Sequence, residues 1–285
     1  MPSYVSFFRN SARAALIAQL GLCAFLGVCI TACSGKKTSV EEDCQAKFDL
    51  LHAKFEKKKY QSIKEPLSEL ITSCPGSNFT EQAMFELAET YFNLGDWVEA
   101  ESEYSAFIKD FPNSRRYGEQ AAYRRAVVLA KQVEKPERDQ TKTLEAITAF
   151  EFFINDFPDS PRADSSGKQV EKLKHQLVDK QMQIAKLYRR MDEPQAAAIY
   201  YKQLLLDYGK FANQREIHLK LAECYVDMNQ FDEAETYLTK FDGIAKDDPF
   251  KEKVKKVYQQ LEKARSKLAR DKKEEREQGK RQEAL

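Results

Sequence analysis

Two stretches of this chain repeat one order of residues, and this repetition limits the possible folds more than any other feature. ELAETYFNLGDWVEAESEY at 86–104 and KLAECYVDMNQFDEAETYL at 220–238 share Leu-Ala-Glu, a tyrosine, a turn, an aromatic residue and Glu-Ala-Glu. The alanines leave room for close helix approach, and Gly95 or Asn229 supplies the turn between two helices. A unit of this kind buries its apolar face by stacking on further copies of itself.

Further copies of the pattern fill the chain between these two. A third, QIAKLYRRMDEPQAAAIYY, lies at 183–201, and a weaker one opens the array around Tyr60 and Pro75. All of them resemble tetratricopeptide repeats, which need only about 34 residues each. The endings DFPNS at 110–114 and DFPDS at 156–160 are 46 residues apart, so one repeat is expanded.

The extra residues of the expanded repeat are predicted to form a long loop at 131–143, around Pro136. From about Glu41 the apolar residues follow the helical period, without runs of alternating strand type. We therefore expect an all-α fold: a tetratricopeptide-repeat (TPR) superhelix of about five helical hairpins over 43–245. A charged C-terminal helix and tail should follow over 246–285, with the tail beyond Leu268.

The first 32 residues indicate export. Arg9 and Arg13 precede nineteen uncharged residues, as in a signal peptide. The next residues, Ile30-Thr31-Ala32-Cys33, resemble a bacterial lipobox, whose cysteine receives lipid before cleavage. That resemblance implies a signal peptide at 1–32, a lipidated Cys33 at the head of a linker over 33–42 and, because Ser34 follows, the outer membrane. A transmembrane anchor helix is the alternative reading of the apolar run.

The charge of the exported part is nearly balanced. Once Arg9 and Arg13 are removed with the signal, 44 basic and 45 acidic side chains remain. Such a balance predicts no general binder of polyanions, and hence no nucleic-acid partner.

Three cysteines lie beyond the lipobox. Cys44 and Cys74 stand near opposite ends of the first predicted hairpin, so folding about residues 58 and 59 brings them level. We expect a disulfide between them in an oxidising compartment, with two buried thiols as the alternative. Cys224 follows Ala222 on a packing face and reads as a core residue.

No pattern indicates catalysis, a cofactor or a metal ion. His52, His175 and His218 are scattered over three predicted helices without the spacing of metal ligands. The chain has no G-x-S-x-G motif and no glycine-rich phosphate loop. We therefore predict a protein that is not an enzyme.

Aromatic residues recur seven positions apart on one side of the first helices. We predict that they line a concave groove for a substrate peptide, the alternative being that they are core residues. The residues of this predicted groove are Phe48, Phe55, Phe85, Phe92 and Tyr123.

The assembled chain resembles the BamD family, lipoprotein subunits of the machine that assembles outer-membrane β-barrels. The resemblance extends from Cys33 to about residue 260 and is clearest in PERDQTKTLEAITAFEFFINDFPDS at 136–160 and SSGKQVEKLKHQLVDKQMQIAKLYRR at 165–190. It implies a non-enzymatic scaffold on the periplasmic face of the outer membrane. The N-terminal repeats would bind the C-terminal segments of unfolded barrel precursors.

The same resemblance implies that the C-terminal repeats, 220–241 and beyond, dock the periplasmic domains of the integral barrel subunit, a BamA-like protein. The charged tail after Leu268 is longer than the family usually has. A pilot lipoprotein for a secretin or pilus channel would share the lipobox and repeats, but not the expanded charged loop. A cell-wall enzyme would need acidic or nucleophilic residues gathered in a cleft.

Overall fold

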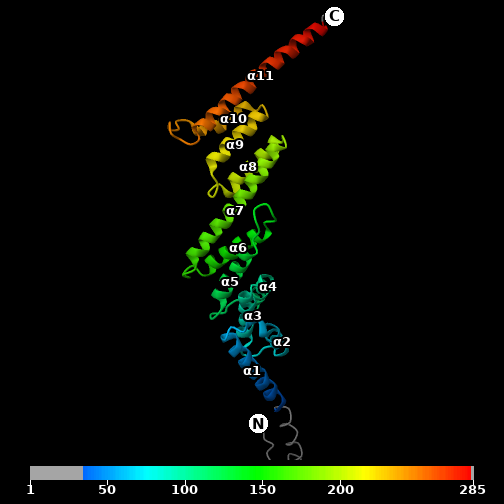
Figure 1. The fold of residues 1–285 in the computed structure, drawn as a ribbon, viewed down its shortest axis with the longest axis vertical. Coiled ribbons are helices and arrows are strands. Elements are labelled where there is room, and N and C mark those ends of the chain that lie inside the picture. Colours follow the sequence, from blue (N-terminus) through cyan, green and yellow to red (C-terminus); the bar gives the residue numbers. More distant parts are fainter. Residues whose placement is uncertain (1–34, 284–285) are drawn as a thin grey trace, which may run out of the picture. The chain divides into compact units, whose positions relative to one another are not determined.

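The computed structural model describes residues 35–283, and every regular element in that range is helical (Figure 1). The chain divides into two compact units, one ending at Phe111 and the other beginning at Pro112. No helix within 35–283 combines the length and the apolar character needed to cross a membrane.

The first unit contains two antiparallel hairpins. Its helices are α1 (Gly35–Glu56), α2 (Lys64–Ser73), α3 (Thr80–Leu94) and α4 (Trp97–Asp110), with a short 3-10 turn, η1, at Tyr60–Ser62. The core of this unit gathers around Ile63 and Leu67, which are fully buried, and the partly buried Tyr91 packs against it. Burial of such apolar side chains is the main force that holds the hairpins together.

The second unit contains three hairpins and a long final helix. Its elements are α5 (Gly118–Lys131), α6 (Thr141–Asp156), α7 (Ala163–Arg190), α8 (Pro194–Tyr208), α9 (Gln214–Asp227), α10 (Phe231–Leu238), the 3-10 turn η2 (Thr239–Phe241) and α11 (Lys251–Glu283). The prediction of an all-α fold of about five tetratricopeptide hairpins is confirmed. The long loop of the expanded repeat is also confirmed, at 132–140.

Small residues sit where the helices of each hairpin approach most closely. Ala88 and Ala100 in one hairpin, and Ala222 and Ala234 in another, have no exposed surface. A larger side chain at these positions would push the two helices apart, since interaxial distances of 8–10 Å depend on the residues at the contact. The sequence pattern therefore acts through packing.

Both ends of the described range are helical. The segment expected as a linker at 33–42 is part of α1 from Gly35 onward. At the other end, the tail expected after Leu268 continues as helix to Glu283. This segment is rich in Lys, Glu, Arg and Ala, which favour helix, and places opposite charges four residues apart.

Candidate functional site

Two of the predicted groove residues are core residues. Phe48 is 5% exposed and stacks on Phe79 with ring centroids 4.6 Å apart, and Phe85 is 6% exposed and meets Phe107 edge-on at 5.8 Å. Neither ring faces an open groove, so their assignment as groove residues is corrected. The seven-residue spacing marked the side of the helix that packs on its neighbours.

The other predicted groove residues remain partly accessible. Phe55 packs edge-on against Tyr60 at 5.7 Å, and Phe92 packs edge-on against Trp97 at 5.6 Å; all four rings are half-buried. Tyr123 belongs to the second unit, where the guanidinium of Arg162 lies 5.2 Å from its ring centroid. Phe55 and Phe92 therefore belong to the first unit, and Tyr123 to the second.

A hollow that sequence reasoning missed lies between α1 and α2. Its volume is about 330 Å³. Its lining is half apolar and half polar: Leu50, Leu51, Pro66 and Leu70, with Lys47, Lys54, Glu69 and Ser73. Leu50 is 60% exposed, on the side of α1 away from the buried Phe48 and Leu51. The signal was available in the sequence, because Leu50 precedes Leu51 and both cannot face the core of one helix.

Near the hollow, the first hairpin is closed by a disulfide between Cys44 and Cys74, with the Cα atoms 6.2 Å apart. Cys224 is a free, fully buried thiol, as predicted for a core residue, and burial raises its pKa to about 12. Such a thiol is inert, because the reactive thiolate hardly forms. Cys33 lies outside the described residues, so its lipidation stays a prediction.

One face of the second unit carries a continuous polar groove. Its largest cavity, about 730 Å³, is lined by Lys186, Arg189 and Arg190 of α7, Tyr201 of α8 and Lys220 of α9. A second cavity of about 540 Å³ shares three of these residues and extends to Phe250 and to Lys253, Lys256 and Val257 of α11. Helices α7, α9 and α11 therefore border one basic surface.

Ion pairs satisfy only part of this charge. Arg189 donates to Glu223 and, at 2.7 Å, to Asp227, while Lys220 lies 3.0 Å from Glu223. Lys186 is 3.7 Å from Glu216. Six lysines and arginines line the two cavities, against three acidic partners, so the groove has a positive surplus suited to an anionic ligand.

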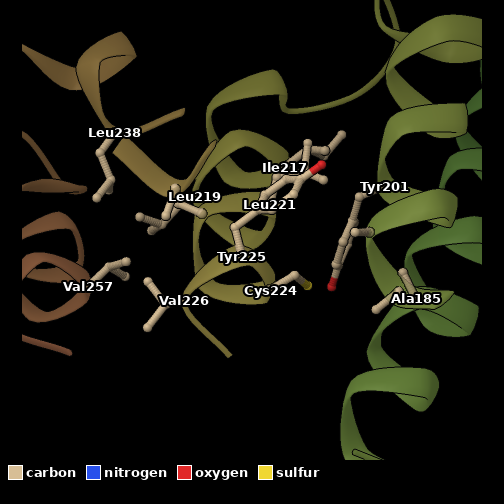
Figure 2. Close-up of a cluster of buried hydrophobic side chains, with 14 of the residues drawn as sticks. Ala185, Tyr201, Ile217, Leu219, Leu221, Cys224, Tyr225, Val226, Leu238 and Val257 are labelled. Carbon is tan, nitrogen blue, oxygen red and sulfur yellow. The ribbon is translucent and has the colours of Figure 1, made fainter. Parts of the chain in front are cut away.

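Apolar side chains of α7, α8, α9, α10 and α11, with Phe241 of η2, form the largest core cluster of the described chain (Figure 2). The ring of Tyr201 enters it between α8 and α9, with its hydroxyl on the side of Cys224. Burial raises the pKa of Tyr201 far above its ordinary value, so the phenol stays protonated and can only donate or accept as a neutral hydroxyl.

No group of three or more His, Cys, Asp or Glu side chains within 35–283 is arranged to hold a metal ion. The hollow between α1 and α2 and the basic groove of the second unit are therefore the two candidate sites.

Comparison with known proteins identifies the family. Residues 43–241 match the sequence model of the YfiO family, described as outer membrane lipoprotein. The chain belongs to this family. The matched range begins within α1 and ends with η2, so it covers all five hairpins of this YfiO family member and leaves α11 outside.

Curated relatives agree with the family match and confirm the resemblance to the BamD family. This YfiO family member is 26% identical over 216 residues to the outer membrane protein assembly factor BamD of Rickettsia prowazekii, covering 74% of this chain and 85% of that one. It is 23% identical to the protein of the same name from Pasteurella multocida, covering 72% and 83%.

Solved structures similar to this YfiO family member include a thermophilic TPR protein of Thermus thermophilus, 19% identical with a TM-score of 0.31, covering 75% of this chain and 98% of that one. Another is a tetratricopeptide repeat protein from Parabacteroides merdae, 12% identical with a TM-score of 0.36, covering 78% and 90%.

Proposed function

We propose that this protein is a lipid-anchored, non-catalytic scaffold subunit of the machine that assembles outer-membrane β-barrels. The observation that carries the proposal is the family match over all five hairpins, together with the name of the curated relatives, outer membrane protein assembly factor. Stacked hairpins present extended surfaces that hold other chains without chemistry of their own.

Anchoring is assigned to Cys33. The lipobox resemblance at 30–33 supports it, and acyl chains on the cysteine would hold the protein on the periplasmic face of the outer membrane without a spanning helix. Mass spectrometry of the N-terminal peptide tests this: a lipidated Cys33 as first residue is expected. A peptide that still contains residues 14–32 would instead favour the transmembrane anchor.

Binding of unfolded barrel precursors is assigned to the first unit. Strands of membrane barrels alternate apolar and polar side chains, so an extended C-terminal segment offers an apolar row. The hollow beside Leu50 could receive part of such a row, and the partly exposed rings of Phe55 and Phe92 offer separate apolar contacts. The buried Phe48 and Phe85 would support that surface from below.

A matched pair of variants tests this surface. Leu50→Ser should weaken binding of a fluorescent peptide with the C-terminal sequence of a barrel precursor by about tenfold, because it removes an exposed apolar side chain from the hollow. Val98→Ser is the control, since Val98 is 68% exposed on α4 and lines no described hollow. Equal affinity of both variants and the wild type would rule out the hollow.

Docking of the integral barrel subunit, a BamA-like protein, is assigned to the C-terminal repeats at 220–241 and to the helix that follows. The family resemblance supports this assignment, and α9, α10 and α11 pack into one body through Leu221, Leu238 and Val257. A folded periplasmic domain would thus meet a rigid surface.

The deciding experiment is purification of the native protein from detergent-extracted envelopes, followed by identification of what accompanies it. A large outer-membrane barrel with repeated periplasmic domains is the expected companion. A secretin or pilus component in its place would overturn the proposal and indicate a pilot lipoprotein.

A further inference from the structure

Two repeats of this protein differ in the hydrogen bonding of an equivalent buried tyrosine. Tyr104 and Tyr201 occupy equivalent positions, thirteen residues after Tyr91 and Tyr188, and both side chains are fully buried. The Tyr104 hydroxyl donates a 2.7 Å hydrogen bond to Glu89 Oε1. The Tyr201 hydroxyl is buried without any hydrogen-bond partner.

The sequence explains the difference. Glu89 lies two residues before Tyr91, and the equivalent residue before Tyr188 is Lys186. An ammonium group only donates, so it cannot accept the hydrogen of Tyr201. A buried hydroxyl without a partner is costly, and native proteins rarely keep one unless something else satisfies it.

A carboxylate placed beside Tyr201, as Glu89 is placed beside Tyr104, would be surrounded by cationic side chains. The cavity of about 730 Å³ is lined by Tyr201 together with Lys186, Arg190 and Lys220. Lys186 has only a long 3.7 Å contact with Glu216, and Arg190 has no ion pair within residues 35–283. A carboxylate bound in this cavity could accept hydrogen bonds from several cationic side chains, including Arg190, whose charge is not balanced by an ion pair in the described part of the chain. Hydrogen bonds between charged groups of this kind are stronger than neutral ones.

We propose that this cavity binds a carboxylate of an acidic, extended peptide segment, which takes the place that Glu89 fills in the second repeat. Arg190 and Lys220 would hold the carboxylate, and Tyr201 would donate to it. The hydroxyl is covered from solvent, so a side chain must shift to admit the ligand. Lys186 can do so, because it lines the same cavity and its side chain is 52% exposed, which leaves it room to move.

The shape of the groove favours a peptide over a small ion. Beyond the first cavity, the second one continues past Leu219 toward Lys253 and Lys256. The α9 residues that border it run from Glu216 to Glu223, about 10 Å of helix, which matches roughly three residues of extended chain. Lysines beside Leu219, Phe250 and Val257 suit acidic residues that alternate with apolar ones.

The inference goes beyond the proposed function and does not depend on it, since the cavity and its unpaired hydroxyl stand whatever machine the protein serves. Its test uses the full chain in detergent and a fluorescein-labelled hexapeptide of alternating Glu and Leu with a free C-terminal carboxylate. The comparison peptide has Gln for Glu and an amidated C-terminus. Fluorescence anisotropy should detect binding of the acidic peptide alone, and the binding should weaken as salt is raised.

Three variants locate the site. Arg190→Gln should weaken binding about tenfold, whereas Lys168→Gln, an exposed lysine of the same helix outside the cavities, should leave it unchanged. Tyr201→Phe should weaken binding about threefold to tenfold while Tm stays equal or rises, because the variant loses an unsatisfied hydroxyl. Lys186→Glu should restore the internal pair of the second repeat, raise Tm and abolish binding.

Several results would overturn the proposal. Equal binding of the acidic and neutral peptides would do so, as would wild-type affinity in both Tyr201→Phe and Arg190→Gln. Binding to vesicles containing phosphatidylglycerol, without binding of the acidic peptide, would assign the cavity to a lipid headgroup instead. If Lys186→Glu fails to fold, the Tyr201→Phe comparison still decides the question.

Discussion

His52 Nδ1 lies 2.7 Å from Glu86 Oε1 and links the first helix of one hairpin to the first helix of the next. Gln82 also donates to the same oxygen at 2.7 Å, while Glu86 Oε2 is buried without a partner. Burial is the largest influence on this carboxyl and raises its pKa above the ordinary value of 4.5, although Gln82 and His52 oppose the shift. The contact between these two hairpins thus includes a carboxylate whose ionised form is disfavoured by burial.

The first prediction concerns the pH dependence of that charge. The pKa of Glu86 is raised in the folded state, so the folded protein favours the protonated carboxyl. The stability that this preference contributes is fully present below pH 4.5 and is lost as pH rises through the folded pKa. Glu86→Gln copies the protonated form, so at pH 8 the variant should melt above the wild type by about 4 °C. Circular dichroism melts at pH 8, 6 and 4.5 measure the gap, which should shrink with falling pH.

The exposed Glu42→Gln serves as control and should show no gap at any pH. A variant that melts below the wild type at pH 8 would show that the hydrogen bonds to Glu86 outweigh its burial.

Turn residues between the paired helices give the second prediction. Gly95, Asp192 and Asn229 occupy equivalent positions, and all have positive φ, of 81°, 60° and 57°. Only glycine adopts this region without strain, so Gly95→Ala should cost about 1 kcal/mol and Asn229→Gly should change stability little or raise it. Urea unfolding of each variant measures these differences. Equal losses in both would mean that side-chain contacts, rather than backbone strain, dominate at these turns.

The disulfide gives the third prediction. Cys44 and Cys74 are 30 residues apart, so opening the loop should cost roughly 3 to 4 kcal/mol by the loop-entropy model. Replacing both cysteines with Ser should lower the free energy of unfolding by this amount, measured with urea. In the wild type, reductant should have a comparable effect, and peptide mapping without reductant should recover the 44 and 74 peptides joined. Insensitivity of the wild type to reductant would contradict the bond.

The same residues show why some features could be predicted from sequence and others could not. That Cys44 and Cys74 lie side by side could be predicted, because it depends only on the lengths of two helices and the position of the turn between them, which the helical period indicates. The burial of Phe48 and Phe85 does not, because the period gives a face but not which neighbour covers it. The basic groove could not be predicted, because its side chains come from α7, α8 and α9 and meet only in the folded protein. The sequence does show that Lys186 stands at the repeat position of Glu89, which indicates that this repeat lacks the carboxylate.

The final helix gives the fourth prediction. Val254, Val257 and Leu261 of α11 are buried against the preceding hairpin, whereas from Ala269 onward almost every described side chain is exposed. Helix without packing adds no hydrophobic stabilisation, so a chain ending at Leu268 should lose helical signal in circular dichroism and keep its Tm within about 1 °C. A chain ending at Gln260 is the matched comparison. It also loses the fully buried Leu261 and should melt several degrees lower, because removing a buried leucine side chain costs about 2 to 5 kcal/mol. If the chain ending at Leu268 also melted several degrees below the full-length protein, the charged end of α11 would have to make stabilising contacts elsewhere on the protein.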